Sequence, residues 1–170
     1  MICESIPIPT RNFNKPPKLI TIRSFDVNKP GIDLDSLLGG VIGGSLLEGV
    51  LRVGDMIEIR PGIVMKDNED RWSCMPLRSQ IVSLRAEKNE LQSGSPGGLN
   101  GVGLRIDPSS TRADNLVGDI LGLPGSLPNV YSELNSSFRL LQRLVGVKAD
   151  SSNPRTQKIG KLKKGETLMF

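Results

Sequence analysis

The sequence predicts an all-β fold, a closed antiparallel β-barrel followed by part of a second domain. Three observations support this prediction. Between Gly39 and Gly62 the apolar residues fall in short runs broken every few residues by glycine, which is typical of strands joined by tight turns. A β-branched stretch precedes this segment, and further short apolar runs follow it. With 37% apolar residues, a chain of 170 residues can bury one ordinary core and begin another.

The first part of the chain is rich in proline. Residues 6–18 contain four prolines, which remove backbone donors and exclude both a helix and a central strand. We therefore interpret residues 1–17 as a linker. Residues 19–27 predict the first strand, and Asn28-Lys29-Pro30-Gly31 ends that strand as a turn.

Residues 39–62 predict a β-meander. Val53-Gly54-Asp55 is the sharpest turn signal in the chain, because glycine accepts a positive φ and aspartate can bond its own backbone. We expect residues 50–53 and 56–59 to pair across this turn, and Pro61 with Gly62 to break the meander. The polar residues 66–71 then predict an exposed hairpin tip.

Two more strands are predicted at residues 72–77 and 80–86. Ile81, Val82 and Leu84 would supply core residues of the second of these strands, with Arg85 facing away from Leu84. After a loop at residues 93–98, a further strand at residues 99–106 contains two glycines, which indicate a bulge or the close approach of another backbone. Residues 116–123 are expected to close the barrel.

These predictions place the barrel at residues 18–123 and the incomplete start of the next domain at residues 124–170. Prolines and glycines mark that boundary. Apolar residues between 138 and 145 fit helical spacing and fit a long strand equally well, and residues 160–170 predict a turn and a strand. Residues 138–165 carry eight Lys or Arg against Asp150 alone, a cluster that could meet phosphate but more commonly forms a solvated face or tail.

The composition excludes several classes of chemistry. The chain has no histidine and only two cysteines, so a structural zinc site and a Ser–His or Cys–His nucleophile are excluded. A Gly-Lys-Ser/Thr phosphate loop is absent, so we expect no GTP hydrolysis, no catalytic residue, and no metal or cofactor bound by this chain. No apolar run is long enough to cross a bilayer, and we expect a cytoplasmic protein that does not bind membranes.

The candidate binding residues are Ile42, Gly43, Gly44 and Ser45. Glycines allow another molecule to approach the backbone, and their amides can donate hydrogen bonds to a carboxyl, ester or phosphate oxygen. The alternative is structural, because small barrels need glycine where strands bend. The residues alone leave both interpretations open.

The pattern of residues 39–59, GGVIGGSLLEGVLRVGDMIEI, resembles the start of the second domain of translational GTPases, the elongation factor Tu-like β-barrel. Four flanking motifs narrow the resemblance to the gamma subunit of eukaryotic or archaeal translation initiation factor 2. They are IRSFDVNKPG at residues 22–31, IRPGIV at 59–64, PGGL with GVG at 96–103, and RADNLVG at 112–118. The resemblance implies that residues 1–17 lead out of a GTP-binding domain and that residues 124–170 begin domain 3, a partial second β-barrel domain.

The resemblance also implies a site and its partners. Positions matching Gly44, Ser45 and Arg85 help to form the pocket for the aminoacyl end of tRNA in that barrel, although Ser45 replaces an arginine and Arg85 an acidic residue. GTP and magnesium would be bound by another domain. The implied partners are methionyl initiator tRNA, the alpha subunit docked on this domain of a heterotrimer with alpha and beta, and, indirectly, the small ribosomal subunit.

Three alternatives stay open at this point. The chain could be a protein-interaction scaffold that does not bind tRNA. It could be domain 2 of another translational GTPase, such as an elongation factor. It could also be an intact but divergent GTPase, which would be stabilised by nucleotide.

Overall fold

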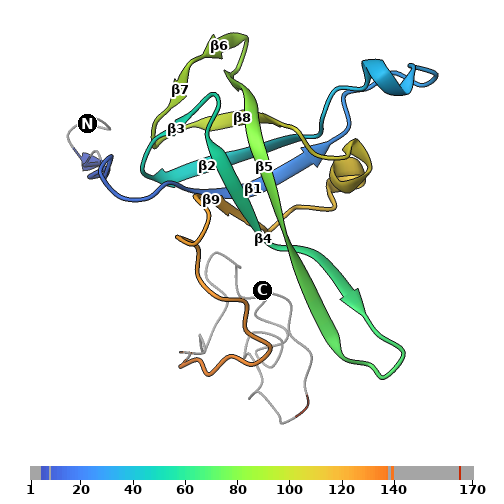
Figure 1. Ribbon diagram of the computed structural model, residues 1–170. Helices are drawn as coiled ribbons and strands as arrows, with labels where there is room; N and C mark the ends of the chain where they lie inside the picture. The colour runs from blue at the N-terminus through green and yellow to red at the C-terminus, as the bar shows by residue number, and fades with distance from the viewer. Residues whose placement is uncertain (1–4, 8, 138, 140–164, 166–170) are drawn as a thin grey trace, which may run out of the picture. The chain divides into compact units, whose positions relative to one another are not determined.

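A computed structural model describes residues 5–7, 9–137, 139 and 165. Six strands form a closed antiparallel ring in the order β4-β9-β1-β2-β8-β5, and β5 pairs back to β4. Their bounds are β1 Lys18–Phe25, β2 Val41–Glu48, β4 Met56–Lys66, β5 Trp72–Ala86, β8 Leu99–Leu104 and β9 Ile120–Gly122. The predicted closed antiparallel barrel is therefore confirmed, and Figure 1 shows its strands winding around one interior.

The remaining elements are short. β6 (Asn89–Leu91) extends the sheet from β5, and β3 (Leu51–Arg52) pairs with β7 (Ser93–Gly94) as a separate two-stranded sheet. Two 3-10 helices, η1 (Leu34–Ser36) and η2 (Pro108–Asp114), lie in the connections. Among the described residues no helix is long and apolar enough to span a membrane.

The core is aliphatic and lies inside the ring. Each barrel strand contributes side chains with almost no exposure, since residues of one parity point inward along a strand. The buried cluster consists of Leu19, Ile42, Leu46, Leu51, Ile57, Ile59, Ile81, Leu84, Val102, Leu104, Leu116 and Leu121. Burial of these side chains is the main favourable contribution to the stability of the barrel.

The predicted meander is wrong. The turn at residues 52–55 forms, because Gly54 has φ +95° and the Asp55 carboxylate accepts a hydrogen bond from the Arg52 amide at 2.8 Å. However, β3 pairs with β7, whereas β4 pairs with β5 and β9. The turn redirects the chain from one sheet to another, and so the strands on its two sides are not partners.

Two predicted strand breaks are also wrong. Pro61 and Gly62 do not end a strand, because β4 continues through a register shift between Ile59 and Ile63. The strands expected at residues 72–77 and 80–86 form one 15-residue strand, β5. The exposed tip at residues 66–71 is confirmed, with the Asp67 amide donating to the Arg71 carbonyl at 3.0 Å. β4 and β5 extend together beyond the barrel as a long arm (Figure 1).

Val82 does not supply a core residue. It is 44% exposed, while Ile81 and Leu84 are buried. A register shift between Ile81 and Ser83 on β5 inserts one residue, so that the inward-facing parity changes along the strand. Arg85 faces away from Leu84, as expected.

The chain divides into two compact units, Met1–Ser132 and Glu133–Phe170. All strands of the barrel belong to the first unit. The helix or strand expected near residues 138–145 and the strand expected at residues 160–170 lie almost wholly outside the described residues. The domain boundaries drawn from the sequence remain a prediction.

Candidate functional site

A hollow of about 760 Å³ lies on the outer face of the barrel. Its lining comes from β1, β2, β5 and β8 and from the segment between β1 and β2. Four of the lining residues are glycines: Gly39, Gly43, Gly101 and Gly103. Gly43 of β2 and Gly101 and Gly103 of β8 carry no side chain, so the sheet surface there is bare backbone.

A row of four residues crosses the floor of the hollow from strand to strand. Arg23 on β1 is opposite Gly43 on β2, Gly43 is opposite Gly101 on β8, and Gly101 is opposite Arg85 on β5. Directly opposed residues of an antiparallel sheet point to the same face. Three strand spacings separate the two arginine backbones, a span of about 14 Å. The row therefore consists of bare backbone with one guanidinium group at each end.

The walls of the hollow are apolar. On β1 a register shift between Thr21 and Arg23 leaves Ile22 as an extra residue, and the matching shift on β5 leaves Val82. Both side chains line the hollow and are exposed by 45% and 44%, respectively. Phe25 and Leu99 also line it. Each bulge thus adds one apolar side chain to the lining of the hollow.

Each arginine is held by a carboxylate. The Arg23 Nε donates to Asp114 Oδ1 at 3.0 Å, and that oxygen also accepts the Ser24 amide at 2.9 Å. The Ser24 hydrogen bond, with a smaller contribution from Arg23, lowers the pKa of Asp114 and keeps it charged. Arg85 forms an ion pair with Glu90. Both guanidinium groups remain largely exposed, so they are positioned without being covered.

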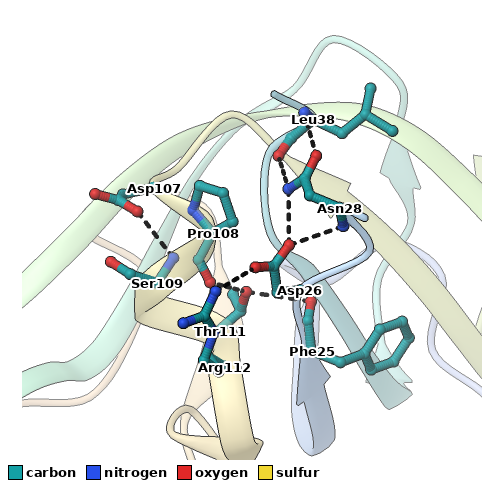
Figure 2. A network of polar contacts seen from close by, with 9 residues as sticks. All are labelled: Phe25, Asp26, Asn28, Leu38, Asp107, Pro108, Ser109, Thr111 and Arg112. Carbon is teal, nitrogen blue, oxygen red and sulfur yellow. Dashed lines mark hydrogen bonds and ion pairs between the residues drawn. The ribbon is translucent and has the colours of Figure 1, made fainter. Parts of the chain in front are cut away.

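The segment between β1 and β2 forms one rim of the hollow, and a network of polar contacts holds this segment in place (Figure 2). The Asn28 side chain donates to the Leu38 carbonyl at 2.8 Å and accepts the Leu38 amide at 2.7 Å. The Asn28 amide and side chain also donate to Asp26, which pairs on its other oxygen with Arg112. Hydrogen bonds from Asn28, followed by Arg112, lower the pKa of Asp26. The network holds Leu38, which lines the hollow, in place.

Four of the residues predicted from the sequence lie on β2 and point to its two faces, and the fifth, Arg85, lies on β5. Ile42 is fully buried in the core, and Gly44 is buried with its missing Cβ directed at β1. Gly43 and Arg85 line the hollow, whereas Ser45 is half-buried and lies outside the lining. Of the five residues, the structure therefore brings Gly43 and Arg85 together at one surface.

The sequence suggests that the backbone amides of Gly43 and Gly44 could donate to a ligand, but they do not lie on an edge strand. β2 is a central strand, with β1 on one side and β8 on the other. Its backbone groups face these neighbours, so its outer face is the part that a ligand can approach. Sequence reasoning missed Arg23, because its place in the row depends on the β1–β2 register. The alternation of Gly101 and Gly103 was a usable signal, since period-2 residues share a face.

The hollow presents groups that can bind a ligand. Within the described part of the chain, no group of three or more His, Cys, Asp or Glu could hold a metal ion. The hollow offers a flat floor, two cations and apolar walls. These groups fit a ligand that combines a planar ring, an anion and an apolar chain.

The fold and this outer face define the class of domain. Residues 39–122 match the family model of elongation factor Tu domain 2, and this segment belongs to that family. The match covers the strands that carry Gly43, Gly101 and Arg85.

The particular relatives are translation initiation factors. The chain is 55% identical over 168 residues to eukaryotic translation initiation factor 2 subunit 3 of Drosophila melanogaster, covering 99% of this chain and 35% of that protein. It is 56% identical over 168 residues to eukaryotic translation initiation factor 2 subunit gamma of Schizosaccharomyces pombe, covering 99% of this chain and 37% of that protein. The predicted resemblance to the gamma subunit is confirmed. The chain spans a little over a third of the length of these relatives.

Proposed function

We propose that this chain is a binding module of a cytoplasmic translation initiation factor. Its barrel would help to bind the aminoacyl end of methionyl initiator tRNA in the hollow and would dock the alpha subunit. The observation that carries the proposal is the Arg23–Gly43–Gly101–Arg85 row at the floor of the hollow. The similarity to initiation factor 2 gamma subunits supports the choice of tRNA.

The chemistry of the row fits the end of a charged tRNA. Gly43 and Gly101 leave room for a flat base or an ester group to lie against the sheet. Arg23 and Arg85 can each hold a phosphate oxygen through paired N–H donors. The apolar walls, including Ile22, suit an unbranched methionine side chain. In this proposal Ile42 and Gly44 act indirectly, by keeping β2 flat beneath the ligand.

Nucleotide chemistry is assigned elsewhere. We propose that GTP and magnesium are bound by another domain of the intact factor, which closes against this barrel and completes the tRNA pocket. The chain itself would neither bind nor hydrolyse GTP. A divergent GTPase would instead be stabilised by about 2.7 kcal/mol at a nucleotide concentration a hundredfold above its dissociation constant. A thermal shift with GTP and magnesium distinguishes the two.

The β4–β5 arm supports the docking of a protein partner. Val64, Met65, Trp72 and Met75 on this arm are each about half exposed or more. Exposed apolar side chains on a two-stranded ribbon are typical of a surface that another protein covers. We therefore propose the arm as the docking surface for the alpha subunit within the heterotrimer with alpha and beta.

The test is an NMR titration of the isotopically labelled chain. The ligand is a stable amide analogue of methionyl-adenosine carrying the preceding phosphate. Amide resonances of β2 and β8 at the floor of the hollow should shift. Gly43→Leu, which puts a bulky side chain on the floor of the hollow, should abolish these shifts, and Arg85→Ala should weaken binding, whereas Arg105→Ala outside the hollow should not.

Separate outcomes identify the alternatives. Shifts confined to the β4–β5 arm on adding purified alpha subunit, with none for the tRNA analogue at millimolar concentration, would support a pure interaction scaffold. Equal shifts with methionyl and bulkier aminoacyl analogues would instead favour an elongation factor-like barrel. If the tRNA analogue still shifted the amide resonances of β2 and β8 in Gly43→Leu, the proposed site would be overturned.

A further inference from the structure

A buried carboxylate lies in β4 at the end of the barrel where the chain leaves the sheet. The Glu58 side chain is 1% exposed and contacts two arginines: Arg60 on its own strand and Arg78 on β5, with Arg78 Nε at 3.2 Å. Burial acts to raise the pKa of Glu58, but the hydrogen bonds and charges of Arg60 and Arg78 together outweigh it, and the pKa lies below its usual value. Glu58 is therefore charged at neutral pH.

Arg60 makes a second set of contacts. Its guanidinium group donates to the carbonyl oxygens of Pro128 at 3.0 Å and of Leu127 at 3.4 Å. Both carbonyls belong to the segment that follows β9, which we call the exit segment (residues 123–130). Arg78 pairs with Glu58 but has no contact with the exit segment among the hydrogen bonds of the described residues.

The exit segment is also seated by one apolar side chain. Leu127 is 6% exposed, and a Cβ added to Gly122 of β9 would lie 2.7 Å from its Cδ2 atom. Packing of the Leu127 side chain fixes the position of the exit segment but still allows its backbone to rotate. The carbonyl contacts remove that freedom, because a guanidinium group is planar and offers its donors in a fixed fork.

The geometry points to Arg60 as a positioning residue that sets the direction in which the chain leaves the barrel. Glu58 fixes the plane of the guanidinium group, and the guanidinium group fixes two successive carbonyls of the exit segment. Rotation of the barrel would therefore carry Leu127 and Pro128 with it. This inference concerns the exit segment and stands apart from the proposed tRNA site.

The test compares two arginines that share one carboxylate. Arg60→Gln and Arg78→Gln each leave Glu58 with a single arginine, but only Arg60→Gln frees the carbonyls. In a Cys3→Ser, Cys74→Ser background, nitroxide labels are attached at Lys88→Cys and Val130→Cys, and their distance distribution is measured by pulsed electron paramagnetic resonance. Far-ultraviolet circular dichroism confirms that each variant is folded.

We expect the single narrow distance peak to be lost in Arg60→Gln and retained in Arg78→Gln. Chymotrypsin cleavage after Tyr131 should accelerate about tenfold in Arg60→Gln alone, which corresponds to the loss of roughly one charge-assisted hydrogen bond. Arg60→Lys keeps a positive charge beside Glu58 but lacks the planar donors of a guanidinium group. Its distance distribution and cleavage rate should therefore match those of Arg60→Gln. It also serves as the test if Arg60→Gln does not fold. Narrow peaks in all variants, or equal broadening in Arg78→Gln, would overturn the inference.

Discussion

The sharpest prediction concerns two neighbouring glycines that face opposite sides of β2. A Cβ added to Gly44 would lie 2.3 Å from the Ile20 carbonyl oxygen and 2.5 Å from the Leu19 Cδ2 atom. A Cβ added to Gly43 would lie 3.6 Å from the Arg23 Cβ atom, which is an ordinary van der Waals contact. Alanine should therefore be rejected at one position and accepted at the next.

The magnitudes follow from what must move. Ile20 lies in β1 and is paired with β2, so its carbonyl group cannot shift without opening the ladder. Overpacking costs about 1–3 kcal/mol, and a weakened ladder hydrogen bond adds about 1 kcal/mol. Gly44→Ala should thus lower the free energy of unfolding by about 3 kcal/mol. Gly43→Ala should leave it unchanged or raise it by up to about 1 kcal/mol, because the unfolded chain loses conformational freedom.

Urea unfolding followed by far-ultraviolet circular dichroism measures both variants. With an m-value of about 2 kcal/mol/M, Gly44→Ala should shift the midpoint down by about 1.5 M. The two variants share one chemical change, so each is the control for the other. Equal destabilisation by both would refute the assignment of their faces, as would a loss of more than about 2 kcal/mol in Gly43→Ala.

Three further predictions follow from polar groups of the barrel. Burial raises the pKa of Asp119 to about 6, although a hydrogen bond from the Gly62 amide acts to lower it. The folded state therefore binds a proton at Asp119 more tightly than the unfolded state does. As a result, stability is lost as the pH rises from about 4 to about 6. Asp119→Asn should remove this loss. In urea titrations its free energy of unfolding should exceed that of the wild type by about 1–2 kcal/mol at pH 7.5 but should not exceed it at pH 4. An equal difference at the two pH values would contradict this prediction. Asn28→Ala should abolish protection of the Leu38 amide in hydrogen exchange. It should lower the free energy of global unfolding by only about 1 kcal/mol, since the two Asn28–Leu38 hydrogen bonds are exposed. Thr111→Val should cost about 1–3 kcal/mol by calorimetry, because the Thr111 hydroxyl is fully buried and lies within hydrogen-bond distance of two carbonyl oxygens; an unchanged stability would contradict this prediction.

Local chemistry made the turns and most strands predictable. Glycine and aspartate at residues 54 and 55 favour a turn through their own conformational preferences, and β-branched runs such as β1 can be identified without knowing their partner. Choice of partner is a different matter. The turn sends β3 to β7 rather than to β4, because pairing is decided by the closure of the whole ring.

The candidate site was predictable only in part, for a reason that lies in the two bulges. Strict alternation would place every second residue of a strand inside. On β1, however, Leu19 and Thr21 are buried before the bulge and Ser24 after it. The extra residue, Ile22, reverses the parity and brings Arg23 to the outer face. A single residue of register decides whether that arginine belongs to the hollow, and sequence periodicity does not report it.

β5 runs without interruption from Trp72 on the arm to Arg85 at the hollow. Thirteen residue steps of a strand cover about 44 Å, so one continuous piece of backbone joins the two places proposed for different partners. A strand resists stretching but yields to torsion. A protein that bound the arm and twisted it would therefore rotate the other end of β5. That end carries Arg85, one of the two arginines proposed to contact the tRNA.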